Sequence, residues 1–189
     1  MTHRVLVINP GSTSTKLAVF SDEEVLFQET LRHEAAVLAE FIRVIDQYPF
    51  RLDIILRWMK SIGIRPRDLD AVVGRGGILR PIVGGTYLVN ETMLDDLDAA
   101  AFGEHASNLG ARLAYEIAAP QCRPAFIVDP PVVDEMEPLA RVSGLPEISR
   151  RSMFHALNQK AVARRACRDM GRRYEDVNLI LVHLGGGLT

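Results

Sequence analysis

The residues that most restrict the fold lie between Arg4 and Phe20. An apolar run at residues 5–8 leads into a turn of glycine, serine and threonine, and a second apolar run follows at residues 17–20. This pattern predicts two antiparallel strands joined as a hairpin. Lys16 lies beside the turn, so the tip would present backbone N–H groups, hydroxyl groups and one cation, which suit a phosphate group. A hairpin turn without any ligand explains the same residues.

The turn differs from a Walker phosphate loop. A serine and a threonine precede Lys16, where the Walker pattern expects a glycine before the lysine. The following apolar run is short and is interrupted by the acidic residues 22–24, which favours a strand and a turn over a long helix. The turn is therefore predicted to belong to a hairpin.

Composition restricts the class of protein. A chain of 189 residues is long enough for one domain, or for a domain and part of another, and its apolar fraction of 48% is enough for a core. The 22 basic and 24 acidic residues give a net charge of −2, so no electrostatic argument favours nucleic acid or an anionic membrane. No apolar run approaches the ~20 residues of a membrane span. Cys122 and Cys167 lack metal-ligand spacing, which, together with the absence of a signal-peptide pattern, predicts reduced thiols in a cytoplasmic protein.

Hydrophobic periodicity predicts a three-stranded meander followed by alternating strands and helices. The expected strands cover residues 5–8, 15–20, 25–31, 70–73, 125–128 and 178–184, and the expected helices cover about 34–48, 52–61, 91–101, 106–119 and 149–170. The first of these helices is expected to end before Pro49, and residues 81–90 form either a hairpin or an extended flap. Such an order predicts an α/β fold with a mixed sheet and flanking helices.

Several predicted strands end in polar or glycine-rich loops. These loops are residues 9–14, 74–77, 129–134 and 183–187. Ligands of open α/β sheets bind at the carboxyl ends of the strands, so these loops are the candidate site.

Two charged side chains in these loops are candidates for chemistry. Asp129 follows a buried strand and precedes two prolines, so its carboxylate could hold Mg²⁺ directly or through water, or it could simply begin a turn. Arg75 lies between glycines, and its planar donor fork suits a substrate carboxylate or a transferring phosphoryl group. A surface arginine in a flexible loop is the alternative interpretation of Arg75.

Two histidines are further candidates. His155 is expected at the start of a helix, where an imidazole could stabilise an anionic transition state, although a structural role explains a lone helical histidine as well. His183 precedes a triple glycine at a predicted strand end, where it could reach phosphates held by the glycine N–H groups.

Taken together, and in this order, the motifs resemble the butyrate kinases of the acetate kinase family. The matching segments are residues 7–16, 71–77, 105–110, 128–135, 154–165 and 183–187. The resemblance implies a ribonuclease H-like domain of the actin-like and sugar-kinase-like class. It also implies ATP-dependent, reversible phosphorylation of a short-chain carboxylate, such as butyrate, to an acyl phosphate with Mg²⁺.

The resemblance also assigns roles to residues. It places Asn9, Ser12, Ser14 and Lys16 in a first phosphate loop, Asp129 as the essential acidic residue, His155 near the transferred phosphoryl group, and His183 with Gly185, Gly186 and Gly187 in a second phosphate loop. Arg75 would bind the carboxylate, although the corresponding arginine of acetate kinases falls a few residues earlier. The full-length family also implies a homo-oligomer.

Family members are longer and contain two related domains with ATP between them. Residues 1–150 are therefore expected to be the first actin-like kinase domain, and residues 151–189 a connecting helix and the first strand of a truncated second domain. Because a one-sided cleft cannot hold ATP in register, the chain alone is expected to have little activity. The alternatives are a kinase for another short or branched carboxylate, or a non-catalytic half that needs a partner for the second domain.

Overall fold

A computed structural model describes residues 2–184, which form two compact units. Unit 1 comprises residues 2–80 and 85–128, and unit 2 comprises residues 81–84 and 129–184. Each unit is described by itself below. The domain boundary after residue 150 stays a prediction. No helix in residues 2–184 is long and apolar enough to cross a membrane.

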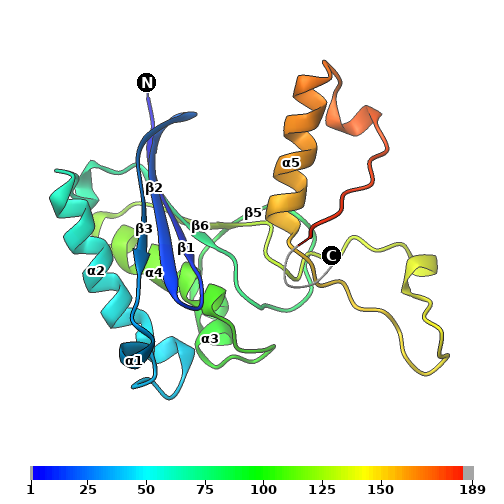
Figure 1. The fold of residues 1–189 in the computed structure, drawn as a ribbon, viewed down its shortest axis with the longest axis horizontal. Coiled ribbons are helices and arrows are strands. Elements are labelled where there is room, and N and C mark those ends of the chain that lie inside the picture. The colour runs from blue at the N-terminus through cyan, green and yellow to red at the C-terminus, as the bar shows by residue number, and fades with distance from the viewer. Residues whose placement is uncertain (1, 185–189) are drawn as a thin grey trace. The chain divides into compact units, whose positions relative to one another are not determined.

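Unit 1 is built on a mixed sheet of six strands (Figure 1). The strands are β1 (Arg4–Pro10), β2 (Ser14–Ser21), β3 (Glu24–Arg32), β4 (Ala71–Arg75), β5 (Thr86–Leu88) and β6 (Ala125–Val128). Their order in the sheet is β3-β2-β1-β4-β6-β5. The first three strands pair antiparallel, β1, β4 and β6 run parallel, and β5 pairs antiparallel with β6. The predicted meander and the mixed sheet are confirmed.

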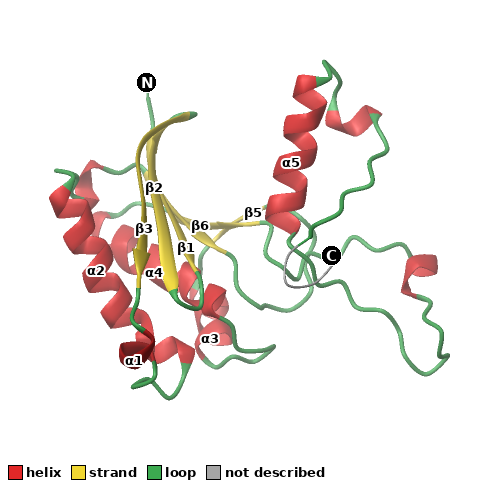
Figure 2. Cartoon of the chain, in the orientation of Figure 1, coloured by secondary structure: helices red, strands yellow, loops and turns green. Residues whose placement is uncertain are grey.

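Residues 2–184 contain as many α-helices as the sequence predicts, and all but α2 are shorter than expected (Figure 2). They are α1 (Ala35–Leu38), α2 (Tyr48–Ser61), α3 (Glu91–Asp98) and α4 (Leu109–Ala118) in unit 1, and α5 (Ala156–Asp169) in unit 2. Short 3₁₀ turns lie at Val44–Gln47, Pro66–Asp68, Ala106–Asn108, Ala119–Gln121, Pro138–Arg141 and Tyr174–Asp176.

One face of the sheet carries the core of unit 1. Alternate residues of the strands point to this face and are buried, namely Leu6, Ile8, Leu17, Val19, Val72 and Ile127. Helix α4 covers this face, and α2 packs against α4 (Figure 1). The close approach of α4 requires glycines, because a Cβ built on Gly74 would overlap the backbone of Gly110. Gly74 therefore makes room for a helix rather than for a ligand.

Three sequence predictions about elements are wrong. The helix expected over residues 34–48 is reduced to α1 and a 3₁₀ turn, and Pro49 lies in the first turn of α2 instead of ending a helix. Proline is tolerated there because first-turn N–H groups have no acceptor within the helix. The long helix expected from residue 149 begins only at Ala156. Residues 178–183 form no strand, since no described segment pairs with them.

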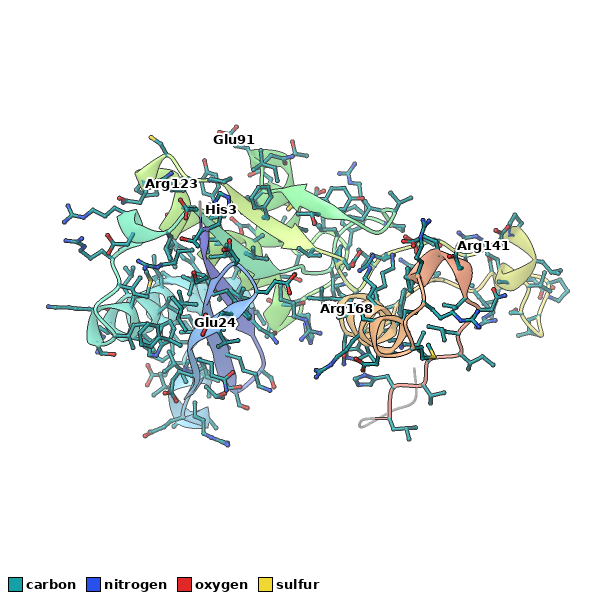
Figure 3. The ribbon with its side chains drawn as sticks, turned by 90° about the horizontal axis from the view of Figure 1, so that it is seen from above. His3, Glu24, Glu91, Arg123, Arg141 and Arg168 are labelled. Carbon is teal, nitrogen blue, oxygen red and sulfur yellow. The ribbon has the colours of Figure 1, made fainter. Side chains whose placement is uncertain are left out.

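Unit 2 contains α5 and long loops. A parallel bridge joins Ile82 to Val133, and the Asp134 N–H donates to the Ile82 carbonyl at 2.8 Å. Arg141, in the 3₁₀ turn seen in Figure 3, pairs with Asp134 at 2.7 Å. Its hydrogen bond to Asp134 holds the pKa of that carboxyl below its usual value. These contacts fix the course of the chain that follows β6.

Candidate functional site

The predicted phosphate loop is the turn between β1 and β2. The Gly11 N–H donates to the Ser14 carbonyl at 2.7 Å, which closes the turn. Ser12 is exposed at its tip, and Ser14 is half-buried where β2 begins. The turn therefore presents small residues and backbone groups to solvent, as the sequence predicts.

A polar row crosses the open face of the sheet at the same end. Asn9 is the register partner of Lys16, and Arg75 ends β4 beside Asn9. The Arg75 Nη1 lies 3.4 Å from the Asn9 Oδ1. Burial lowers the pKa of Arg75 from its ordinary value, but an arginine remains a cation at neutral pH. Two cations and an amide, each from a different strand, thus lie side by side at one end of the strands of unit 1.

A hollow of about 590 Å³ lies on the same open face of the sheet. Asn9 and Lys16 line it together with apolar side chains of the first two strands, including Val7 and Phe20, and with the polar Thr30 of β3. Glu29 lines it as well, so the lining carries one cation and one carboxylate, and Asn9 and Lys16 place the hollow beside the predicted phosphate loop.

Asp129 occupies an unusual backbone position directly after β6. Its φ is +38°, in the left-handed region that non-glycine residues rarely adopt, and Pro130 follows it. A residue before proline is normally driven to extended backbone, so this conformation is strained. The Asp129 side chain is only 4% exposed. A strained, buried carboxylate at a strand end is a feature that clusters at functional sites.

Two cations from α5 face this carboxylate. The Lys160 Nζ lies 3.7 Å from the Asp129 Oδ1, and the Arg164 Nη1 lies 3.9 Å from the Asp129 Oδ2. Lys160 also donates to the Glu135 Oε1 at 2.8 Å, and the Gly84 N–H donates to the same oxygen at 2.8 Å. The bond from Lys160 is the largest cause that lowers the pKa of Glu135. A Cβ built on Gly84 would overlap the Lys160 Nζ.

Asp129 and Glu135 are the carboxylates of unit 2 that bear on the predicted Mg²⁺ site. Within residues 2–184 no three histidine, cysteine, aspartate or glutamate side chains are gathered as a metal cluster. Mg²⁺ keeps several waters and is usually bound through one or two carboxylates and substrate phosphates. Asp129 and Glu135 are such carboxylates, but Lys160 contacts both of them and Arg164 faces Asp129, so a Mg²⁺ ion would compete with these cations.

The two predicted histidines lie together in unit 2. The rings of His155 and His183 stack with centroids 4.3 Å apart and an interplanar angle of 11°. The Asn158 Nδ2 lies 3.4 Å from the His183 Nδ1. His155 is the residue that precedes the first turn of α5. Gly185, Gly186 and Gly187 lie outside the described residues.

Sequence reasoning missed two residues, Arg51 and Lys160. Arg51 is buried in α2 below the β1–β2 turn, in line with the buried residues Ile55, Trp58 and Met59. An arginine that continues an apolar helix stripe is a signal that could have found it. Lys160 carried no comparable signal, because its partners come from distant parts of the sequence.

The fold is similar to that of acetate and propionate kinases. The chain is 19% identical to an acetate kinase from Porphyromonas gingivalis, with a TM-score of 0.67, and 18% identical to a propionate kinase from Francisella tularensis, with a TM-score of 0.62. Each of these comparisons covers 98% of this chain and 53% of the other. An acetate kinase from Entamoeba histolytica is 16% identical, with a TM-score of 0.55, over 88% of this chain and 46% of that one. No protein-family model matches the sequence.

These similarities confirm the predicted α/β fold class, a mixed sheet with flanking helices. The assignment to the actin-like and sugar-kinase-like class stays a prediction. The chain spans about half the length of the kinases that it matches. The structures compared are acetate and propionate kinases, so the resemblance to butyrate kinases stays a prediction.

Proposed function

We propose that this chain is part of an ATP-dependent short-chain carboxylate kinase that forms an acyl phosphate and ADP, with butyrate as the substrate. The observation that carries the proposal is the row of Asn9, Lys16 and Arg75, which lies across the sheet where β1 and β4 end and β2 begins. The acetate-kinase-like fold supports the same reaction class. A kinase for another short or branched carboxylate shares every feature of this proposal except the acyl chain.

The reaction asks the protein to hold two anions together. A carboxylate is already a nucleophile at neutral pH, so no general base is required. In this proposal Arg75 binds the carboxylate through its planar fork. Lys16, Asn9 and the turn that carries Ser12 and Ser14 hold the phosphates of ATP. Two anions held in register then react as if they belonged to one molecule.

The residues of unit 2 would manage the charge of the transferred group. Asp129 would hold Mg²⁺ through water, and the ion when bound neutralises charge on the phosphate oxygens. His155 and His183 would donate hydrogen bonds to the phosphoryl oxygens, which carry the negative charge in the transition state. Gly185–Gly187 belong to the proposed site on sequence grounds.

Two variants test whether Arg75 binds the carboxylate and Lys16 binds the phosphates of ATP, as proposed. Arg75→Lys removes the fork but keeps the charge, so the KM for butyrate should rise roughly tenfold or more while the KM for ATP is unchanged. Lys16→Met should instead raise the KM for ATP and leave the KM for butyrate unchanged. The matched control is Arg123→Lys, because Arg123 is exposed and lies before β6, at the opposite end of the parallel strands from Arg75 (Figure 3).

A substrate panel completes the test. Acetate, propionate, butyrate, isobutyrate and a set of sugars are offered with ATP and Mg²⁺, and the product is trapped with hydroxylamine. Hydroxamate from butyrate in preference to acetate supports the proposal. Phosphorylation of a sugar, or equal KM values for butyrate in Arg75→Lys and Arg123→Lys, would contradict it.

A second candidate function is a half that needs a partner for the second domain. It is favoured by exposed apolar side chains at Ile180, Val182 and Leu184, which are 95%, 61% and 80% exposed. The same segment and the facing side of α5 line a largely apolar hollow of about 420 Å³. Exposed apolar surface of this kind marks an interaction site. Full activity of the 189-residue chain as a monomer would rule this candidate out.

A further inference from the structure

Arg51 is the one arginine of unit 1 that lies fully within the core. Its side chain belongs to α2 and is 1% exposed. The Nη1 donates to the Gly11 carbonyl at 2.9 Å and to the Ser14 carbonyl at 3.2 Å, and the Nη2 donates to the Ser12 carbonyl at 3.4 Å. One guanidinium therefore binds three carbonyls of the turn that carries the predicted phosphate-loop residues.

The remaining partners of Arg51 are also uncharged. The Nη1 donates to the Thr15 Oγ1 at 3.1 Å, and the Nε and Nη2 donate to the Gln47 Oε1 at 3.2 and 2.8 Å. None of the ion pairs among residues 2–184 involves Arg51. Burial lowers the pKa of Arg51 to about 10, so the group is a cation at neutral pH. A buried cation without a carboxylate is costly unless an anion approaches it.

The geometry of the turn follows from these bonds. In a trans peptide the C=O of one residue and the N–H of the next point in opposite directions. Because Arg51 binds the Gly11 and Ser12 carbonyls, the N–H groups of Ser12 and Thr13 point away from the guanidinium. Neither N–H donates a hydrogen bond to any described residue. Successive outward N–H groups form a concavity that binds anions.

A neutral histidine completes the network below the turn. The Thr15 Oγ1 lies 2.9 Å from the His33 Nε2. The Thr15 Oγ1 also accepts from Arg51, so this hydroxyl joins His33 to the guanidinium. Burial first, and the charge of Arg51 second, lower the pKa of His33. Arg51 is therefore the charged member of this network at neutral pH.

We propose that Arg51 is a positioning residue for the phosphates of the nucleotide: it holds three turn carbonyls inward, so that the Ser12 and Thr13 N–H groups face the ligand. Its uncompensated charge adds a second attraction for the polyphosphate from behind the turn. This inference rests on the proposed function and extends it to a residue that does not itself touch the substrate.

The test compares Arg51→Met and Arg51→Lys with Arg57→Met. Arg57 lies on the same helix, is 74% exposed in its side chain and pairs with Asp53, so it is a matched control for the loss of an arginine from α2. The probe is inorganic tripolyphosphate, and the dissociation constant is measured by calorimetry on folded protein. Arg51→Met should weaken binding roughly tenfold or more, Arg51→Lys less, and Arg57→Met not at all.

Two further readouts separate positioning from general loss of structure. The KM for the carboxylate should not change in Arg51→Met. Arg75, which is proposed to bind the carboxylate, lies on β4 and not in the β1–β2 turn that Arg51 contacts. The pKa of His33, followed by NMR, should rise in Arg51→Met when the neighbouring charge is removed. Where Arg51→Met does not fold, Arg51→Lys carries the same measurements, with a smaller expected loss of tripolyphosphate binding.

The outcomes distinguish this inference from the proposed function. Suppose that Lys16→Met weakens tripolyphosphate binding, whereas Arg51→Met and Arg51→Lys leave it unchanged. This result overturns the inference about Arg51 but not the proposed function. The inference is also overturned if Arg51→Met changes the KM values for ATP and for the carboxylate equally, or if the pKa of His33 does not change in Arg51→Met. Tripolyphosphate binding that is absent from the wild type, or unchanged in Lys16→Met, overturns the phosphate site and the proposed function with it.

Discussion

A single methyl group at Gly84 should disrupt the contacts around Asp129. A Cβ built there would overlap the Lys160 Nζ, and it would lie 2.5 Å from the Glu135 Oε1 and 3.0 Å from the Asp129 Oδ1. The backbone φ of Gly84 is not in the left-handed region, so the conformation itself suits alanine and the effect is steric. Either Lys160 leaves its place between the two carboxylates or the backbone shifts.

The expected cost of Gly84→Ala is about 1–2 kcal/mol, because the added Cβ meets the ends of flexible side chains and what is lost is the bonding of Lys160 to the two carboxylates. For a chain of this size that loss lowers the Tm by about 2–8 °C. The control is Gly144→Ala, because Gly144 also lies in unit 2 and a Cβ built there has nothing within 4 Å. Thermal melts followed by circular dichroism measure both variants.

A double-mutant cycle identifies the cause. Lys160→Met shortens the side chain by one atom and removes the charge, so it opens space for the added methyl. Gly84→Ala should therefore cost less in the Lys160→Met background, with a coupling free energy of about 1 kcal/mol or more. Equal Tm values for Gly84→Ala and Gly144→Ala, or strict additivity in the cycle, would refute the contacts described around Asp129.

The remaining predictions concern unit 1. The pKa of His33 is lowered in the folded state, so the unfolded chain takes up this proton more readily, and stability falls as the pH drops below the ordinary value of 6.5. His33→Gln should flatten the loss of Tm between pH 7 and pH 5, and an equally steep loss would contradict this. Gly74→Ala should destabilise unit 1 by roughly 3 kcal/mol, because its Cβ meets the backbone of Gly110, and a Tm within 2 °C of wild type, roughly 1 kcal/mol at this size, would contradict the close approach of α4. Cys122 is exposed and Cys167 is buried, so a thiol reagent should label only the first before unfolding, and labelling of both in the native protein would contradict this burial.

Local patterns predicted the sheet well because strand signals depend on near neighbours. The three runs before residue 33 form strands as expected, and β6 covers the predicted residues 125–128. The error near residues 34–48 arose because apolar spacing alone favoured a helix, whereas Pro49 is positioned to begin one. Residues 178–183 are apolar enough for a strand, but a strand also needs a partner, which a single run of residues does not reveal.

The residues of the candidate site also divide into those that local sequence patterns predict and those that depend on distant contacts. The motifs identified Asn9, Lys16 and Arg75, and the register of the sheet brings these side chains into one row. Gly74, which precedes Arg75, accommodates α4, and the sequence alone did not reveal this close approach. Sequence reasoning could not find Lys160, because its contact with Glu135 spans 25 residues. Arg51 carried a signal in the apolar stripe of α2, but its contact with Gly11 spans 40 residues, so its role was not readable from the sequence.

Trapping of acyl hydroxamate is the most direct test of carboxylate kinase activity. ATP, Mg²⁺, butyrate and hydroxylamine are incubated with the 189-residue chain and with any longer product of its gene, each as wild type and as Asp129→Asn. Butyryl hydroxamate that depends on ATP and is lost in Asp129→Asn is the expected result, and activity confined to a longer product would support the need for a second domain. No hydroxamate from any short carboxylate, or full activity in Asp129→Asn, would contradict the proposed function.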